Sequence, residues 1–238
     1  MKTIKEEIFK FKQFSIAQEQ TAMKVGTDGV LLGAWANINH ARNILDVGTG
    51  TGLIALMCAQ KQPFANIDAV ELDPAAARQA IENFKNSPWS NQLKVIQTDF
   101  QSFTSEKKYD VIISNPPYFD ENTSSPEIQR RLARHTQALT LSNLIRQAKK
   151  MLKPQGNIQL ILPADKQEEL TKILQQEQLY LNEICYVKGH PTAKIKRIMI
   201  KFSKNYSLLT ENHLTIEYAR HQYTEDYIRL TRDFYLKM

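Results

Sequence analysis

Short apolar runs alternate with stretches of helical periodicity along most of this chain. The apolar runs are too brief for helices and end at Gly, Pro, Asp or Asn, which is typical of buried strands. The predicted strands span residues 43–47, 67–71, 93–97, 109–113, 157–162 and 180–187, with a further strand centred on 198–200. The predicted helices cover 30–35, 139–152 and 165–177, and two more begin at Leu53 and near Pro74. This alternation indicates an α/β protein with a mostly parallel sheet.

The two ends of the chain extend this pattern. Residues 8–14 alternate apolar and basic side chains, as one half-solvated strand would, and residues 214–218 and 224–236 suggest one more strand and an amphipathic helix. We find no internal repeat, low-complexity tract or linker in the sequence. We therefore expect a single domain over residues 1–238, made of an extension (1–40), a core (41–202) and a C-terminal strand and helix (203–238).

A glycine-rich turn follows the first predicted strand of the core, and an acidic residue precedes it. Glycine permits a tight turn and close approach of the backbone to a ligand. The spacing differs from the Gly-x-Gly-x-x-Gly pattern of dinucleotide sites. A carboxylate here would repel a pyrophosphate but attract an ammonium or sulfonium. The alternative is a glycine-rich turn with no ligand. The candidate binding residues of this turn are Asp46, Gly48, Thr49, Gly50 and Gly52.

Acidic residues also follow the next two strands. Glu71 ends the second strand of the core, where an acid suits the hydroxyls of a ribose, and Leu72 follows it directly. Asp99 follows the third strand and could accept a hydrogen bond from an adenine amino group, while Phe100 covers the face of the ring. One acid after a strand is weak evidence, but three after successive strands favour a nucleoside-like ligand.

The fourth strand of the core ends in Asn115, Pro116, Pro117 and Tyr118. In open α/β sheets, ligands gather at the carboxyl ends of the strands. The side-chain oxygen of Asn115 and the carbonyl of Pro116 could accept both protons of an exocyclic amino group and aim its lone pair at an electrophile. Tyr118 could stack on the attached ring, which is worth about 1–3 kcal/mol for a base. The alternative is a plain Asn-Pro turn after a strand.

Lys24 and Asp28 are polar residues beside the Gly-Thr-Asp-Gly turn at 26–29. A structural role at the turn is one interpretation, and a position at the border of the ligand is the other. We include both among the candidate cofactor contacts.

Composition and charge narrow the class of protein. Hydrophobic residues make up 42% and charged residues 24%, as in ordinary globular proteins. No apolar run is long enough to span a membrane, the first residues have no signal-peptide pattern, and two cysteines make no disulfide framework or metal motif. We therefore expect a cytoplasmic protein without a metal or membrane partner. A net charge of +6 and a pI near 9.2 favour an anionic partner, nucleic acid first.

Two basic segments are candidates for contacts with phosphates. The first follows Tyr118 within residues 119–138, which have no clear periodicity; the second precedes the strand centred on 198–200. A solvated loop and a solvated strand end are the respective alternatives. The candidate residues are Arg130, Arg131, Arg134, His135, Lys194, Lys196 and Arg197.

Together these motifs resemble those of class I S-adenosylmethionine-dependent methyltransferases. The resemblance spans roughly residues 20–202 and rests on Asp46 to Gly52, Glu71, Asp99 with Phe100, and Asn115 to Tyr118. More narrowly, residues 22–35, the Asn115 motif, and residues 223–228 with 233–235 resemble the bacterial tRNA1(Val) (adenine-N6)-methyltransferases. These methylate the adenine immediately 3′ of the anticodon.

The resemblance implies a Rossmann-like sheet of seven strands with helices on both faces, S-adenosyl-L-methionine as cofactor, and a tRNA anticodon stem-loop as partner, with a monomer favoured. It also implies catalysis by Asn115, Pro116, Pro117 and Tyr118, with Asn115 close to the cofactor. The same tetrapeptide serves methyltransferases that act on DNA adenine, RNA guanine and protein glutamine. The glutamine enzymes carry a helical domain before the catalytic one and the DNA enzymes a target-recognition domain, and neither fits here. A non-catalytic RNA-binding module is a further alternative, against which the intact motifs argue.

Overall fold

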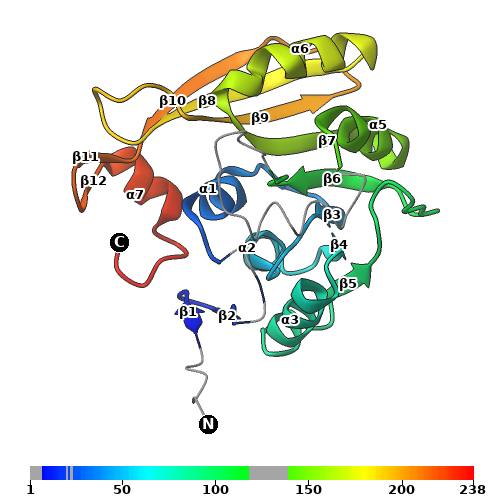
Figure 1. Ribbon diagram of the computed structural model, residues 1–238, viewed down its shortest axis with the longest axis horizontal. Helices are drawn as coiled ribbons and strands as arrows, with labels where there is room; N and C mark the ends of the chain where they lie inside the picture. Colours follow the sequence, from blue (N-terminus) through cyan, green and yellow to red (C-terminus); the bar gives the residue numbers. More distant parts are fainter. Residues whose placement is uncertain (1–6, 20, 22–23, 118–138) are drawn as a thin grey trace, which may run out of the picture.

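A computed structural model describes residues 7–19, 21, 24–117 and 139–238. Its centre is a sheet in the order β10-β8-β9-β7-β6-β3-β4-β5 (Figure 1). Strands β3 to β7 run parallel to one another, whereas β9 is antiparallel to both its neighbours. The strand bounds are β3 (Asn43–Val47), β4 (Asn66–Glu71), β5 (Leu93–Gln97), β6 (Tyr109–Ser114), β7 (Leu152–Pro163), β8 (Tyr180–Lys188), β9 (Arg197–Ser203) and β10 (Thr210–Thr215).

The expected α/β fold is confirmed, and the sheet has one strand more than the seven expected. The additional strand is β10, which pairs in parallel with β8 at the sheet edge. It begins four residues before the strand predicted at 214–218, because its first residues are polar and exposed and carry no apolar signal. Residues beyond it form a separate hairpin of β11 (Glu217–Ala219) and β12 (Gln222–Tyr223).

Helices cover both faces of the sheet (Figure 1). On one face, β3 residues such as Ile44 pack with α1, α2, α3 and α7; on the other, Leu45 packs with α5 and α6. Successive strand residues point to opposite faces, so an apolar run with helices on both sides fills two cores. The helices are α1 (Thr27–Trp35), α2 (Leu53–Lys61), α3 (Pro74–Lys85), α5 (Leu141–Met151), α6 (Gln167–Gln176) and α7 (Glu225–Thr231), with a 3-10 turn at Ala164–Lys166.

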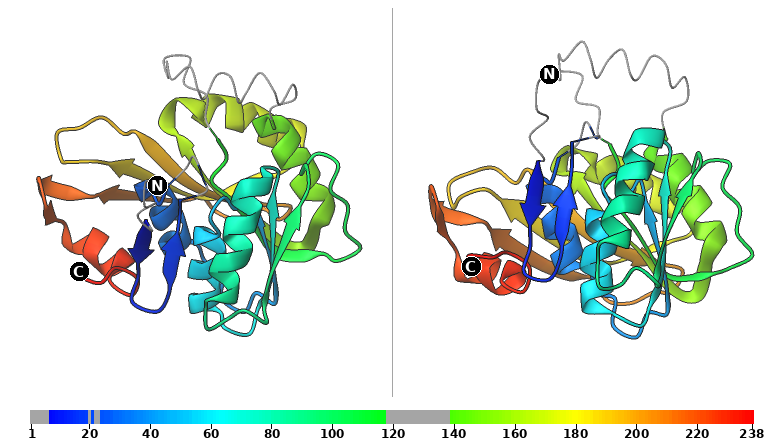
Figure 2. Two further views of the ribbon diagram at one scale, coloured as in Figure 1. Left: turned by 60° about the horizontal axis from the view of Figure 1, so that its bottom comes forward. Right: turned by 90° about the horizontal axis from the view of Figure 1, so that it is seen from below.

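The single strand predicted at 8–14 is wrong: the segment is a hairpin of β1 (Ile8–Lys10) and β2 (Ser15–Ala17). The chain reverses at residues 11–14, which lets Phe11 and Phe14 both turn inward and stack with ring centroids 4.6 Å apart. The hairpin lies between the C-terminal segment and α3 (Figure 2). Phe11 pairs with Tyr235, and the Asn83 amide of α3 bonds both backbone groups of Ala17.

Helices α1 and α2 pack tightly enough to position the glycine-rich turn that precedes α2. A Cβ on Gly33 would lie 2.6 Å from Met57 Sδ, so a larger residue there would force the buried Met57 side chain to shift. The largely buried Lys61 donates to the carbonyls of Ala34 and Ala36 at 2.8 and 2.5 Å, which satisfies acceptors at the end of α1. Within the described residues, no helix is both long and apolar enough to cross a membrane.

Candidate active site at the carboxyl edge of the sheet

The sheet reverses its strand order beside β3. The chain proceeds from β3 through β4 to β5 on one side, and β6 returns to the other side of β3. Such a switch point is where open α/β sheets bind ligands. The register pairs Val47 with both Val70 and Ser114, so Gly48, Glu71 and Asn115 come next along three adjacent strands. The topology therefore brings the predicted motifs to one edge.

The backbone of the glycine-rich turn has a conformation that residues other than glycine adopt only with strain. Gly48, Gly50 and Gly52 have φ values of 71°, 58° and 87°. A Cβ on Gly52 would lie 2.4 Å from the ring of Phe84, whereas one on Gly48 or Gly50 would meet no atom of the described residues within 4 Å. Gly52 thus packs against the protein, and the first two glycines face open space into which a ligand fits against the backbone.

Asp46 is a buried acid with an incomplete set of partners. Its side chain is 0% exposed, and Oδ2 accepts a hydrogen bond from Thr49 Oγ1 at 2.6 Å. Oδ1 has no hydrogen-bond partner among the described residues. Burial raises the pKa of Asp46 to about 7; the Thr49 hydroxyl and the nearby Ala55 N–H counteract this in part. An unsatisfied buried oxygen costs about 1–3 kcal/mol, which a cationic ligand would offset.

Glu71 is fastened to the same turn. Its Oε2 accepts from the Gly50 N–H and its Oε1 from the Asp73 N–H, both at 2.8 Å. A carboxylate has about four lone-pair positions, so two bonds leave room for ligand hydroxyls. Leu72 beside it is 43% exposed and offers an apolar surface. The turn and the acid therefore form one rigid unit.

Asp99 follows β5, the next strand along the edge. Its Oδ1 accepts from the Gln101 N–H at 2.8 Å, and the residue is half-buried. Phe100 is only 4% exposed, because its ring packs in the core beside Phe103. The expectation that Phe100 covers the face of an adenine ring is therefore not met, because its ring is packed in the core and offers no open face for stacking.

Asn115 is half-buried at the end of β6, between the buried Ser114 and the buried Pro116, with Pro117 exposed. Ser114 Oγ donates to the Val47 carbonyl at 2.7 Å, which ties the end of β6 to β3. Sequence reasoning missed Ser114 as a positioning residue. Its signal was a hydroxyl at the end of an otherwise apolar strand. The predicted residues Tyr118, Arg130, Arg131, Arg134 and His135 lie outside the described residues.

Five further predicted contacts lie around α1 and the start of β9. Asp28 and Arg197 form an ion pair at 2.8 Å, so a predicted cofactor contact and a predicted RNA contact share one interaction. Lys24 pairs with Glu7 at 2.5 Å, with both side chains about half exposed. Lys194 and Lys196 are exposed in the turn before β9.

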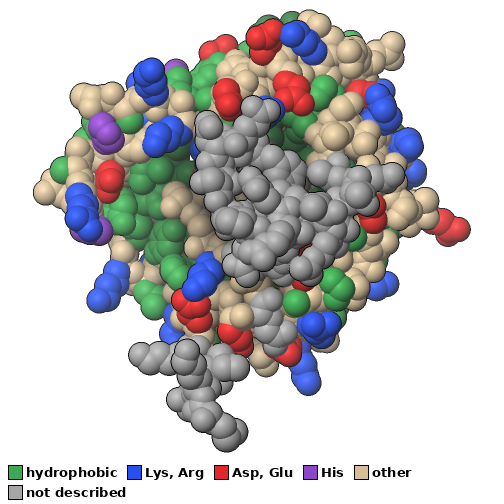
Figure 3. All heavy atoms as spheres, viewed as in Figure 1, with side chains coloured by type: hydrophobic (Ala, Val, Ile, Leu, Met, Phe, Trp, Pro, Cys, Tyr) green, Lys and Arg blue, Asp and Glu red, His purple; other side chains and the backbone are tan. Residues whose placement is uncertain are grey.

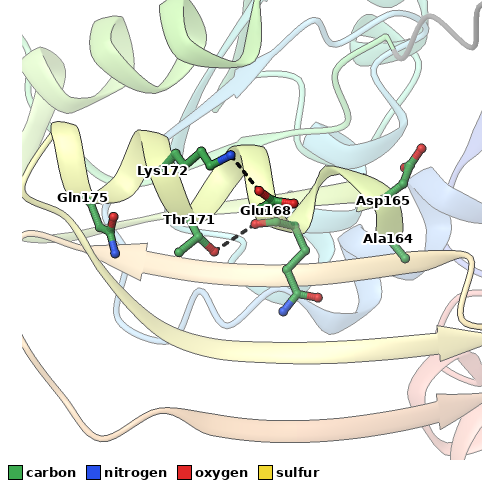
Figure 4. A pocket seen from close by; sticks show the side chains of 7 residues that line it. Ala164, Asp165, Glu168, Thr171, Lys172 and Gln175 are labelled. Atoms are coloured by element: carbon green, nitrogen blue, oxygen red, sulfur yellow. Dashed lines mark hydrogen bonds and ion pairs between the residues drawn. The ribbon is translucent and has the colours of Figure 1, made fainter.

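A surface depression lies apart from this site. A depression of about 580 Å³ runs along the outer surface of α6, where Glu168 pairs with Lys172 and Thr171 bonds the preceding turn (Figure 4). No residue that lines the depression belongs to the predicted motifs. Among all the residues that the structure describes, no three His, Cys, Asp or Glu side chains gather in a way that would hold a metal ion.

Comparisons with known proteins agree with this geometry. The family model of the methyltransferase small domain matches residues 22–190. Solved structures share the fold: a predicted O-methyltransferase from Agrobacterium tumefaciens has a TM-score of 0.68 at 19% identity, covering 87% of this chain and 96% of that one. A TehB-like S-adenosylmethionine-dependent methyltransferase from Corynebacterium glutamicum has a TM-score of 0.51 at 16% identity, covering 77% and 90%. Fold and site thus define a Rossmann-like methyltransferase.

Curated relatives narrow the class further. A tRNA1(Val) (adenine(37)-N6)-methyltransferase from Parabacteroides distasonis is 46% identical, covering 97% of this chain and 98% of the relative. The protein of that name from Flavobacterium psychrophilum is also 46% identical, covering 97% and 100%. The chain belongs to the family of tRNA1(Val) (adenine(37)-N6)-methyltransferases, which confirms the resemblance noted in its motifs.

Proposed function

We propose that this protein transfers a methyl group from S-adenosyl-L-methionine to the exocyclic N6 of adenine 37 in tRNA1(Val). The observation that carries the proposal is the register of β3 and β6, which sets Asn115 beside the glycine-rich turn and the buried Asp46. A group that binds an amino nitrogen and a group suited to a cationic cofactor thus share the switch point. The names of the curated relatives support the choice of substrate.

The donor set of the turn fits S-adenosyl-L-methionine. The unpartnered Oδ1 of Asp46 suits the ammonium of its methionine part, and the open backbone at Gly48 and Gly50 leaves room for the chain that follows. Glu71 would accept from the ribose hydroxyls and Asp99 from the adenine amino group, with Leu72 against the ring. When bound, this cofactor supplies an electrophilic methyl group on a sulfonium.

Asn115 and Pro116 would orient the target nitrogen. The Asn115 side-chain oxygen and the Pro116 carbonyl accept the two N6 protons, which withdraws the lone pair from the ring and directs it toward the methyl group. Positioning of this kind needs no general base of shifted pKa. An anticodon loop already exposes its bases, so withdrawing one costs less than from a duplex. Tyr118 would stack on the extracted adenine.

The remaining predicted contacts belong to the same proposal. Lys194, Lys196 and the segment of Arg130, Arg131, Arg134 and His135 would hold phosphates that flank the target. Arg197 would contact a phosphate while it remains paired with Asp28, and Asp28 would border the cofactor. We propose that the protein acts in the cytoplasm as a single-domain monomer.

The test is methyl transfer from radiolabelled S-adenosyl-L-methionine into total bacterial tRNA, protein and DNA, followed by mass identification of the labelled nucleoside. We expect label in tRNA as N6-methyladenosine. Label in protein would instead indicate glutamine methylation, and label as N2-methylguanosine in RNA would move the target to guanine. Either result contradicts the proposal.

A variant connects the reaction to Asn115. Asn115→Ala should lower kcat by about 100-fold or more, the scale for losing one preorganised hydrogen-bonding group at a reacting atom. Binding of S-adenosyl-L-methionine in calorimetry should remain. Asn91→Ala, in an exposed turn, is the matched control. Near-normal methylation by Asn115→Ala would show that the assigned role is wrong.

A further inference from the structure

The edge of the sheet that carries the site continues past β7 to a basic and aromatic surface. Strand β9 is antiparallel to β7, and β8 and β10 run opposite to β9, so β8 and β10 end where β9 begins. The pairs Pro163–Arg197, Val187–Arg197 and Thr215–Lys188 place these ends in line with the carboxyl ends of β3 to β6. The β11–β12 hairpin therefore stands on the same edge as Asn115.

Two backbone hydrogen bonds join the hairpin to the turn after β8. Ile216 N–H donates to the Lys188 carbonyl and Glu217 N–H to the Gly189 carbonyl, both at 3.0 Å. The residues of the hairpin and the turn consequently form one surface. We name it the distal edge and define it by Lys188, His190, Tyr218, Arg220, His221 and Tyr223.

The chemistry of the distal edge suits a phosphate backbone. Tyr218 is 63% exposed, and Tyr223 is 37% exposed while its ring rests 5.2 Å from that of the buried Tyr227. Figure 3 shows Lys, Arg and His side chains gathered on the left rim of this face, where Figure 1 places β11, β12 and the β8–β9 turn. The acids nearest in sequence are Glu217, whose carboxylate accepts the His221 backbone N–H at 3.1 Å and keeps its charge, and the exposed Glu225 and Asp226 at the start of α7. Cations beside exposed tyrosine hydroxyls are typical donors to the phosphates of a nucleic acid.

We infer that the distal edge binds the phosphate backbone of the stem that closes the anticodon loop. This inference rests on the proposed function, because Asn115 must hold the target base. Four strand spacings separate β6 from β10, which is about 19 Å at roughly 4.8 Å each. The distal edge is thus too far to touch the target adenine and close enough to hold the RNA that continues from it.

Removing two cations tests the inference. The variant is Lys188→Gln/Arg220→Gln, and the matched control is Lys85→Gln/Lys150→Gln, which removes two exposed lysines near the amino edge of the sheet. In the edge variant we expect KM for tRNA to rise about fivefold or more. The slope of log KM against log salt should fall in magnitude by about 1.4–1.8, the value for two lost phosphate contacts. Its kcat and its KM for S-adenosyl-L-methionine should equal those of the wild type.

A tyrosine variant and a shorter RNA substrate test the inference independently of the two cations. Tyr218→Phe should raise KM for tRNA by about fivefold without changing the salt slope, because its hydroxyl would donate to a phosphate oxygen and carries no charge. With an oligonucleotide that has the loop sequence alone, wild type and edge variant should give the same KM. If Lys188→Gln disturbs the pairing of β8 with β10, Arg220→Glu in the exposed turn replaces it.

The outcomes distinguish two failures. If the wild type methylates tRNA and the edge variants match the control, the distal edge does not bind RNA, while the proposed function stands. If the wild type transfers no methyl group to tRNA but does so to another substrate, the proposed function fails first.

Discussion

Asp46→Asn should make the protein more stable above neutral pH while abolishing binding of its cofactor. The folded state raises the pKa of Asp46 from 3.8 to about 7, chiefly through burial. A raised pKa in an acid means that the folded state disfavours the charged form. Below pH 3.8 the carboxyl is protonated in both states and costs the folded protein no stability. As pH rises from 3.8 to 7 the free energy of unfolding falls, because the unfolded state ionises first, and above pH 7 this loss is constant.

The magnitude follows from the size of that shift. About three pKa units correspond to about 4 kcal/mol at 1.36 kcal/mol per unit. The asparagine removes this cost, but its amide N–H groups would occupy the position of the unpartnered Oδ1 and cost about 1–3 kcal/mol. The variant should thus be more stable than the wild type by about 1–3 kcal/mol at pH 8. The advantage should vanish or reverse near pH 4.5.

The assay is urea unfolding of both proteins from pH 4.5 to 8.5, with calorimetric titration of S-adenosyl-L-methionine. Asp110→Asn is a control of opposite sign. Burial alone would raise the pKa of Asp110, but hydrogen bonds from Lys153 and from the Asn43 and Arg42 N–H groups outweigh it and lower the pKa. Its stabilisation is present above pH 3.8 and lost on acidification, so this variant should be destabilised at pH 8. Should Asp46→Asn prove less stable than the wild type at pH 8, or its difference from the wild type not vary with pH, the reasoning is wrong.

Three further substitutions test the surroundings of the site. Gly52→Ala should lower the free energy of unfolding by about 2 kcal/mol or more, because its φ of 87° and the nearby phenylalanine ring both oppose a Cβ. The control in thermal melts is Gly189→Ala, where an added Cβ would meet no described atom within 4 Å. Lys61→Met should cost about 1–3 kcal/mol in urea unfolding, since it leaves the carbonyls at the end of α1 unpaired. Ser114→Ala should cost about 1 kcal/mol and lower kcat without changing KM for tRNA, because the end of β6 loses its bond to β3. An unchanged unfolding midpoint in urea for either of the last two variants would contradict the assigned hydrogen bonds.

Local sequence was sufficient to predict most elements and which polar residues follow the strands at the edge of the sheet. The strands that end at Val47, Glu71 and Gln97 were predicted because apolar runs end at turn residues, and Pro74 marked the first turn of α3 as expected. Asp46, Glu71 and Asn115 were recognisable because a strand end followed by a particular polar residue is a local pattern. Such patterns depend only on residues a few positions apart.

The hairpin of β1 and β2 and the polar edge strand β10 could not be predicted in the same way. The chain reverses near Phe11 because that ring packs on Tyr235, at the far end of the sequence. Strand β10 forms because the edge of β8 offers unpaired backbone groups, and its exposed polar residues give no periodic signal.

The sequence by itself determined the α/β class, the positions of the parallel strands and the identity of the residues at their carboxyl ends, because these depend on local apolar and turn patterns. The tertiary structure decided the rest. It set the strand order that joins Asn115 to the glycine-rich turn, the ion pair of Asp28 with Arg197, and the alignment of the distal edge with the site. It also buried Asp46 and raised its pKa, since desolvation depends on everything packed around a side chain and not on its neighbours in sequence.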